Sequence, residues 1–264
     1  MHRSQAERPF PFHPDPEQSS IRVLTINVHK GFGLFRRRFV LHELRDAIRT
    51  TGADLVFLQE VLGEHRQFAR HHANWPSVPQ YEFLADTIWT QFAYGRNAVY
   101  PDGDHGNGLL SKYPIASHEN IDVSVRNSEP RGFLHCVMVV PDTGVRFHAL
   151  CVHLGLREAH RTTQAERLVA YIRNAIPPGV PLVVAGDFND WRLQLDGVLG
   201  RIGLREAFIE RFWKPARTFP ALSPVFRLDR IYVRGATVEA ASVLGGRPWA
   251  RLSDHIPLSA QLTL

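Results

Sequence analysis

Cysteine is scarce in this sequence, because only Cys136 and Cys151 occur among its 264 residues. Two cysteines cannot build a disulfide framework, and a chain of this length does not need one to form a core. Long apolar runs are also missing, since no stretch approaches the roughly 18 residues that a membrane-spanning helix requires. The first 20 residues contain no apolar segment typical of a secretory signal. We therefore expect a cytoplasmic protein that folds in a reducing compartment.

Motifs of several enzyme classes are absent as well. The sequence has neither the GxxxxGK(S/T) motif of a P-loop nor the GxSxG turn of a serine hydrolase. It contains 14 histidines, but no HExxH motif and no CxxC pair indicates a zinc site. The stretch that begins at Asp102 starts like an EF-hand loop, yet Asn107 and Tyr113 stand where that loop requires glycine and glutamate. These classes therefore gain no support.

The charge balance is mildly basic. Lys and Arg number 31 against 26 Asp and Glu, which gives a formal net charge of +5 and a pI of about 9.5. This excess favours an anionic partner such as DNA or RNA, but the sequence lacks the dense basic stripe of a non-specific DNA binder. The run 36–38 consists of three arginines, which fit the solvated start of a helix or a surface that steers DNA or an anionic membrane.

The periodicity of the chain divides it into an arm and one domain. Residues 1–20 hold four prolines and little periodicity, so we predict a flexible arm there, and we predict a single domain over residues 21–264. Helical spacing occurs over 37–50 and 157–176, whereas 63–105 indicates a short helix with loops. The runs typical of strands are 21–28, 54–61, 109–111, 133–140, 145–154, 181–187, 228–234 and 256–264. Interleaved hairpins and helices favour mixed sheets with helices on their faces.

Polar side chains stand at the ends of these apolar strands, where burial is costly unless each group has a partner. They are Asn27, Glu60, His153, Asp187 with Asn189, Asp229, and Asp254 with His255. Taken singly, each has an ordinary explanation, such as a turn residue or a satisfied core histidine. Six such strand ends in one chain are improbable as independent accidents. We therefore expect loops at one edge of stacked sheets to bring these residues together.

In their order and spacing these residues resemble the endonuclease/exonuclease/phosphatase superfamily, the deoxyribonuclease I-like proteins. The motifs that carry the resemblance are LTINVHKG, LVFLQEV, HGNGLLSKYPI, ALCVHLG, VVAGDFND, LDRIYV and SDHIPL, which together span residues 21–264. The resemblance implies an α/β (α+β) fold, a four-layered αββα sandwich of two mixed β-sheets packed face to face with helices outside. It also implies hydrolysis of a phosphate ester that depends on a divalent metal, Mg²⁺ or alternatively Mn²⁺.

The resemblance also implies roles for individual residues. Asn27, Glu60 and Asp254 are the expected metal-binding residues. Asp187 orients or deprotonates the attacking water, and either Asp187 or His255 is the general base. Asp229 orients His255, whereas His153 and Asn189 donate hydrogen bonds to phosphate oxygens. Asn107 and Arg131 are candidate contacts to the substrate phosphate. His29 departs from the pattern, because some family nucleases carry an acid there, and this leaves the full ligand set open.

The expected activity is that of a phosphodiesterase acting on nucleic acid. Phospholipid headgroups and small soluble phosphate esters are alternative substrates, because the aromatic residues of 81–100 suit a lipid or a sugar as well. A noncatalytic relative that uses the sandwich only for binding is a further alternative, although it has no need for Glu60, Asp187 and His255 together. The sequence indicates no obligate protein partner, and nothing in it specifically supports a membrane surface.

Overall fold

The computed structural model describes residues 19–34, 38–141 and 143–264. Residues 1–18 of the predicted arm, and Arg36 and Arg37 of the basic run, lie outside the described residues. None of the helices in the described ranges is long and apolar enough to cross a membrane. A cytoplasmic location stays a prediction.

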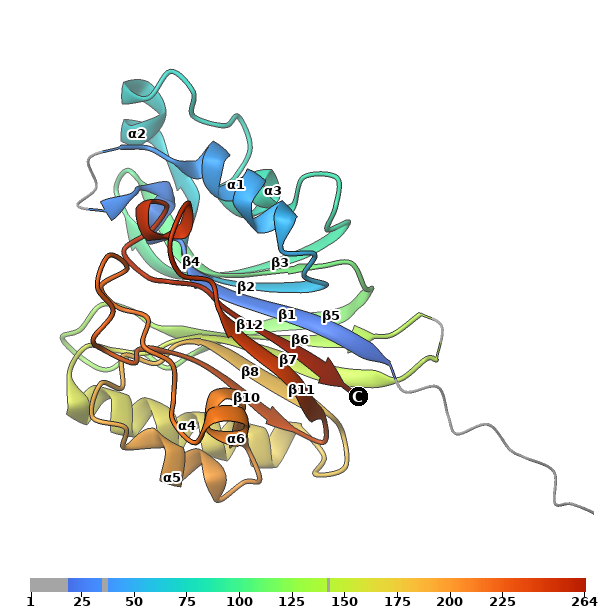
Figure 1. Ribbon diagram of the computed structural model, residues 1–264. Helices are drawn as coiled ribbons and strands as arrows, with labels where there is room; N and C mark the ends of the chain where they lie inside the picture. Colours follow the sequence, from blue (N-terminus) through green and yellow to red (C-terminus); the bar gives the residue numbers. More distant parts are fainter. Residues whose placement is uncertain (1–18, 35–37, 142) are drawn as a thin grey trace, which may run out of the picture.

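Two six-stranded sheets form the centre of the protein (Figure 1). The first has the order β11 (Thr237–Val243), β12 (Leu258–Thr263), β1 (Ser20–Asn27), β2 (Leu55–His65), β4 (Gly103–Ser111), β3 (Gln91–Tyr100). The second has the order β5 (Ile115–Asp122), β6 (Gly132–Val139), β7 (Arg146–His153), β8 (Leu182–Asp187), β10 (Asp229–Arg234), β9 (Arg205–Glu206). The pairs β1–β2 and β7–β8 are parallel and the other neighbours are antiparallel, which confirms the predicted mixed sheets.

Helices cover the outer face of each sheet (Figure 1). On the first sheet lie α1 (Leu41–Thr50) and α3 (Gln80–Ala85), with α2 (Arg66–His71) nearby. Beneath the second sheet lie α4 (Glu158–Ala175) and α5 (Leu195–Gly200). Helix α6 (Ala207–Phe212) instead packs against β11 and β10, with Ala207 and Phe208 in the core between the sheets. The described ranges also contain two short 3₁₀ turns, η1 (His29–Gly31) and η3 (Trp249–Arg251). The four-layered αββα sandwich is therefore confirmed.

Three apolar cores hold the layers together because alternate side chains of a strand point to opposite faces. In β1, Val23 packs between the two sheets, and Leu24 packs with residues of α1. In β7, Cys151 belongs to the core between the sheets, whereas Val152 packs with residues of α4. Strands buried on both faces must be apolar at nearly every position. This explains why β1, β2, β7 and β8 were visible in the sequence.

The prediction for residues 63–105 was wrong in its main feature, because this stretch contains β3 and the start of β4. Glycines interrupt the apolar pattern of β4, and the structure shows why they occur. A Cβ on Gly106 would lie 1.9 Å from the carbonyl oxygen of Gly95 on β3. β5 and β11 were not predicted either, since most of their side chains are exposed and show no apolar run. Helix α1 begins at Leu41, four residues later than expected.

The strand directions bring the polar strand ends to one edge. The parallel strands β7 and β8 end side by side, with His153 paired to Asp187. The antiparallel strand β10 begins at the same edge, with Asp229 paired to Asp187. In the facing sheet, β1 ends at Asn27, which is paired to Gln59 on β2. The sheet register alone therefore aligns three of the predicted site residues in one row.

Candidate active site

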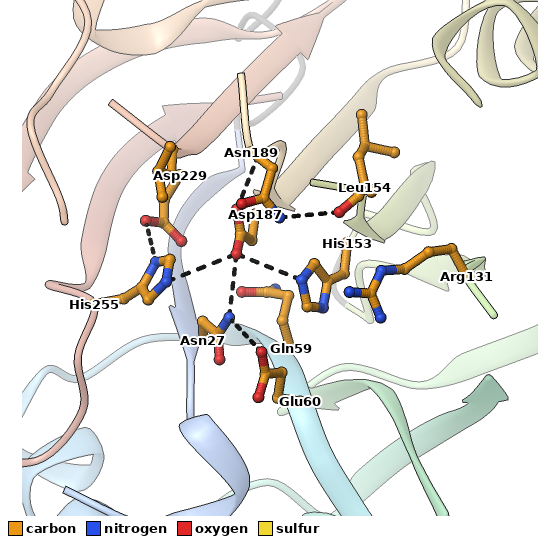
Figure 2. Close-up of polar contacts among 12 residues, drawn as sticks. Asn27, Gln59, Glu60, Arg131, His153, Leu154, Asp187, Asn189, Asp229 and His255 are labelled. Atoms are coloured by element: carbon orange, nitrogen blue, oxygen red, sulfur yellow. Dashed lines mark hydrogen bonds and ion pairs between the residues drawn. The ribbon is translucent and has the colours of Figure 1, made fainter. Parts of the chain in front are cut away.

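The carboxylate of Asp187 lies at the centre of the site (Figure 2). The amide nitrogen Nδ2 of Asn27 donates a hydrogen bond of 3.1 Å to its Oδ2 atom. Nε2 of His153 lies 3.6 Å from the same oxygen, and Nε2 of His255 lies 3.8 Å from it. Asp187 is 1% exposed, so these partners replace the water that the carboxylate loses. One buried carboxylate thus joins residues of both sheets.

Asn27 extends this cluster to Glu60. Its Nδ2 atom also lies 3.4 Å from Oε1 of Glu60, so a single amide stands between two carboxylates. Glu60 is half-buried, in contrast to Asp187. The Oδ1 atom of Asn27 accepts a hydrogen bond of 3.0 Å from the backbone N–H of His29, which fixes the orientation of the amide. The cluster therefore has a buried side and a side open to solvent.

Two site residues adopt strained backbone conformations. Glu60 has φ of 54° at an irregularity in the β2–β4 pairing, and Asn189 has φ of 51°. Non-glycine residues rarely adopt such positive φ values, and they do so mostly where function or local bonding requires it. The backbone N–H of Asn189 donates to Oδ1 of Asp187 at 2.9 Å, and its Nδ2 donates to the carbonyl oxygen of Leu154 at 2.9 Å. These bonds hold the GDFN turn in place.

His255 is held by a carboxylate on its other side. Its Nδ1 atom donates to Oδ2 of Asp229 at 2.9 Å, so Nε2 faces Asp187. Burial lowers the pKa of the imidazole, but the carboxylates of Asp229 and Asp187 outweigh this effect and raise it to about 10. Burial raises the pKa of Asp187 to about 6, although His255 opposes the rise. At neutral pH, His255 is therefore an imidazolium beside an ionised Asp187.

His153 has the opposite electrostatic environment. Complete burial, with the nearby Arg131 guanidinium, holds the pKa of His153 well below its usual range. It is therefore neutral at pH 7. Arg131 lies next to His153 (Figure 2) and pairs with Glu129 at 2.7 Å. The guanidinium is 6% exposed, and its Nε atom has no hydrogen-bond partner in the structure.

Two other predicted residues lie in different surroundings. Asn107 is fully buried, and its Nδ2 donates to the carbonyl oxygens of Gly132 and Cys151 at 2.8 and 3.2 Å. Both amide hydrogens are used to join the sheets, so none remains for a phosphate, which corrects the role expected for Asn107. The Oδ1 atom of Asp254 lies 3.7 Å from Nδ1 of His29. His29 is the first residue of η1, so this contact joins Asp254 to that turn. The role of Asp254 in metal binding stays a prediction.

The donor set suits a hard divalent cation. Asp187, Asp229 and His255 form a group whose possible ligand atoms lie within 4.8 Å of one another. The Oδ1 atom of Asp229 is buried without a hydrogen-bond partner. Buried carboxylate oxygens of this kind are usually satisfied by protein, water or an ion. A second set contains the carboxylates of Glu60 and Asp187, and Asn27 turns its Nδ2 atom toward both of them, so the role of Asn27 in metal binding stays a prediction. Because Nδ1 of His255 is already bonded to Asp229, we favour the set around Glu60 for the cation.

Sequence reasoning missed residues that position the site. Ser253 is fully buried, and its hydroxyl donates to the carbonyl oxygen of Asn27 at 2.6 Å and accepts from the His255 N–H at 3.2 Å. Because Ser253 belongs to the SDH motif, the sequence could have indicated that it lies at the site. Thr218 accepts the N–H of Asp229 at 3.3 Å, and the ring of Phe219 lies 5.0 Å from that of His255. No pattern in the sequence pointed to these two.

The class of protein follows from a match to a family of phosphate-ester hydrolases, in keeping with the four-layered sandwich and with the carboxylates, amides and histidines gathered at one edge. The chain belongs to the Endonuclease/Exonuclease/phosphatase family, whose model matches residues 24–255. It is 55% identical over 249 residues to the uncharacterized protein YbhP of Escherichia coli K12, with 94% of this chain and 98% of YbhP covered.

Solved structures confirm the fold. The mannosyl-6-phosphatase Bt3783 of Bacteroides thetaiotaomicron superposes with a TM-score of 0.70 at 18% identity, over 92% of this chain and 100% of that one. D. rerio TDP2 in complex with a single strand DNA product superposes with a TM-score of 0.67 at 16% identity, over 93% and 100% of the two chains. These identities are low, so the likeness concerns architecture alone.

Proposed function

We propose that this phosphate-ester hydrolase is a Mg²⁺-dependent phosphodiesterase. The observation that carries the proposal is the set of contacts around Asp187, where one buried carboxylate meets Asn27, His153 and His255. Glu60 would hold the cation, with Asp187 beside it, and the Nδ2 atom of Asn27 would keep the two carboxylates in place. When bound, the cation supplies positive charge that stabilises the phosphate oxygens and the leaving oxygen. The half-buried position of Glu60 suits an ion that keeps several of its waters.

Asp187 is the better candidate for the general base. Its pKa is raised to about 6, so at pH 7 it is ionised yet basic enough to accept a proton from water. The pKa of His255 is raised to about 10, which keeps the imidazole protonated and unable to accept that proton. We therefore assign His255 to the phosphate as a charged donor. Asp229 holds it in the orientation that this role needs.

Neutral donors complete the assignment. The imidazole of His153 is uncharged at pH 7 and can donate one hydrogen bond to a nonbridging oxygen. Asn189 uses one amide hydrogen on the carbonyl oxygen of Leu154 and keeps the second for the phosphate. Arg131 can add positive charge from behind His153. Such fixed donors stabilise charge that grows in the transition state without reorganisation.

A noncatalytic relative is the weaker alternative. Burial raises the pKa of Asp187, which means that keeping it ionised costs folding free energy. A module that only binds gains nothing from that cost. Nucleic acid is the substrate class that the net charge favours, and the TDP2 neighbour is named with a DNA product. The residues described above are assigned to the phosphate alone, so the substrate class depends on the surface around them.

The test is the hydrolysis of bis(4-nitrophenyl) phosphate with Mg²⁺ or Mn²⁺, with and without EDTA. We expect release of nitrophenolate that stops when EDTA is added and returns when excess metal is restored. Hydrolysis that survives EDTA, or that never appears with either metal, contradicts the proposal. A preparation of the Asp187→Asn variant in the same assay controls for a contaminating phosphodiesterase.

A further inference from the structure

The surface beside the site is dominated by one segment of the chain, residues 211–228, which runs from the end of α6 to the start of β10. It contains four cations and no acidic residue. Its large apolar side chains are also unusually exposed. Trp213 is 89% exposed, Leu222 61% and Val225 55%. Single exposed apolar residues are normal on a protein surface, whereas contiguous exposed apolar surface is typical of an interaction site.

The backbone of this segment is well bonded, so the exposure of its side chains is not a sign of a loose loop. Thr218 donates its N–H to the carbonyl oxygen of Phe226 at 2.8 Å and accepts the N–H of Ile256 at 2.9 Å. The N–H of Ala221 donates to the carbonyl oxygen of Asp254 at 2.8 Å. The fold therefore fixes the segment against the site while its apolar side chains stay outside.

The segment reaches from the catalytic residues to the outer surface through a chain of aromatic contacts. The ring of Phe219 lies 5.0 Å from His255 and 6.5 Å from Phe226, which lies 6.4 Å from Trp191. Phe219, Phe226 and Trp191 line an apolar hollow of about 270 Å³ that also contains Asn189. Trp191 and Phe226 are themselves 47% and 44% exposed. The apolar surface is thus continuous with the site.

Two further hollows lie along the segment. One of about 550 Å³ is lined by Phe219, Leu222 and Asp254, and it is largely apolar. The other, of about 580 Å³, is lined by Phe212 with three cations, Lys214, Arg217 and Arg227. Among the described residues, none of the four cations of the segment takes part in an ion pair. Unpaired cations beside exposed apolar side chains are what an anionic, apolar partner would complement.

We propose that residues 211–228 dock the protein on an anionic lipid bilayer. Basic residues attract the negative surface of such a bilayer, while tryptophan and aliphatic side chains enter the boundary between headgroups and acyl chains. A single-stranded nucleic acid is the other polyanion to consider, but its bases stack on aromatic rings. Leu222 and Val225, two of the most exposed side chains, offer no ring for stacking. Their aliphatic character favours the bilayer.

Docking in this orientation sets the class of substrate. The aromatic contacts lead from the docking segment to His255, so a phosphodiester at the level of the lipid headgroups would enter the site directly. The substrate would be a phosphodiester carried by the lipid surface, with its apolar part toward Phe226 and Trp191. This substrate class rests on the proposed phosphodiesterase function, whereas the docking surface does not.

The test is flotation of the full chain with vesicles of phosphatidylcholine, with and without phosphatidylglycerol, in the presence of EDTA. We expect the protein to float with the anionic vesicles, to stay in solution with the neutral ones, and to release as salt is raised. The variant Trp213→Ser/Leu222→Ser should bind roughly tenfold more weakly, because two apolar side chains no longer leave water. Phe92→Ser/Val99→Ser, on the exposed edge strand β3, is the matched control and should bind like the wild type.

Several results would overturn the docking surface. One is a lack of flotation with anionic vesicles at low salt. Another is equal binding by Trp213→Ser/Leu222→Ser and the wild type. The third is binding to a single-stranded oligonucleotide that is tighter than binding to the vesicles and that Trp213→Ser weakens. If the double variant does not fold, brominated phosphatidylcholine in the anionic vesicles should quench the tryptophan fluorescence of the wild type, and unchanged fluorescence contradicts docking. Flotation in EDTA needs no turnover, so it tests the docking surface separately from the phosphodiesterase activity. The protein can float without hydrolysing the phosphodiester, and it can hydrolyse the phosphodiester without floating.

Discussion

The first sheet contributes Asn27 and Glu60 to the site, whereas the second contributes His153, Asp187 and Asp229. The groups of the second sheet are almost completely buried, with Asp187 and Asp229 each 1% exposed, and Glu60 is half-buried. Burial changes the proton affinity of the residues on the second sheet, because it raises the pKa of Asp187 and lowers the pKa of His153. The difference suggests a division of labour. In the proposed mechanism the second sheet would handle protons and phosphate, and Glu60 of the first sheet would hold a hydrated cation.

The largest effect is expected from Asp187→Asn. The amide cannot accept the proton of water, so turnover of bis(4-nitrophenyl) phosphate should fall by about 10² to 10⁴-fold. The melting temperature should be unchanged or raised, because the variant removes a carboxylate that is costly to bury. Asp190→Asn is the control, because Asp190 lies three residues after Asp187 and its carboxylate accepts the N–H of Leu195 instead of facing the site. Equal activity of Asp187→Asn and wild type would remove Asp187 from the site.

Glu60→Gln probes the other sheet. The variant should raise the Mg²⁺ concentration for half-maximal activity by at least about tenfold, because a neutral amide binds a hard cation less well than a carboxylate. Saturating Mg²⁺ should restore much of the turnover, in contrast to Asp187→Asn. Glu64→Gln, on the same strand but exposed, serves as the matched variant and should leave the metal dependence alone. If Glu60→Gln leaves the metal dependence unchanged, the proposed division between the sheets is wrong.

A smaller effect is expected on the pH profile from Asp229→Asn. The wild type needs Asp187 ionised and His255 protonated, so kcat/KM should be highest between about pH 6 and pH 10. Without the Asp229 carboxylate the pKa of His255 falls, and the alkaline limb should move about one to three units to lower pH. The acidic limb should move less. An alkaline limb that stays in place would show that His255 does not set it.

The smallest effect concerns stability. The folded-state pKa of His255 is raised to about 10 from its ordinary 6.5, so its contribution is complete below pH 6.5 and is lost as pH rises through 10. Between these values the difference in unfolding free energy between wild type and His255→Gln should shrink by about 1–3 kcal/mol. Urea unfolding at pH 6 and pH 10 measures it. A difference that grows with pH would contradict the buried ion pair with Asp229.

The sequence was informative wherever polar residues interrupt strands that are apolar on both faces. Asp187 follows such a strand, and Asp229 opens the strand beside it, so their register could be expected from the pattern. The same reasoning failed for β3 and for the first part of β4, because Gly106 is required by the close approach of the strands and not by any apolar period. It also misjudged Asn107, whose amide joins the two sheets. Contacts between sheets leave no trace in local periodicity.

Protonation states were equally hidden in the sequence. Whether Asp187 or His255 is the base could not be chosen from residue types, because the answer depends on burial and on the distances to neighbouring charges. The same two side chains exposed to solvent would titrate near their ordinary pKa values. The exposed apolar side chains of residues 211–228 are a further example, since exposure is a property of the folded chain. Candidate site residues could be proposed from the sequence, but their distribution between the two sheets could be seen only in the structure.

The central claim is that side chains of both sheets meet at one cation. Anomalous scattering from a crystal grown with Mn²⁺ and phosphate tests it most directly. We expect one metal peak in contact with the carboxylate of Glu60, within the cluster that includes Asn27 and Asp187, with the phosphate within reach of His153 and His255. A metal held by Asp187, Asp229 and His255 without Glu60, or a metal away from this cluster, would contradict it.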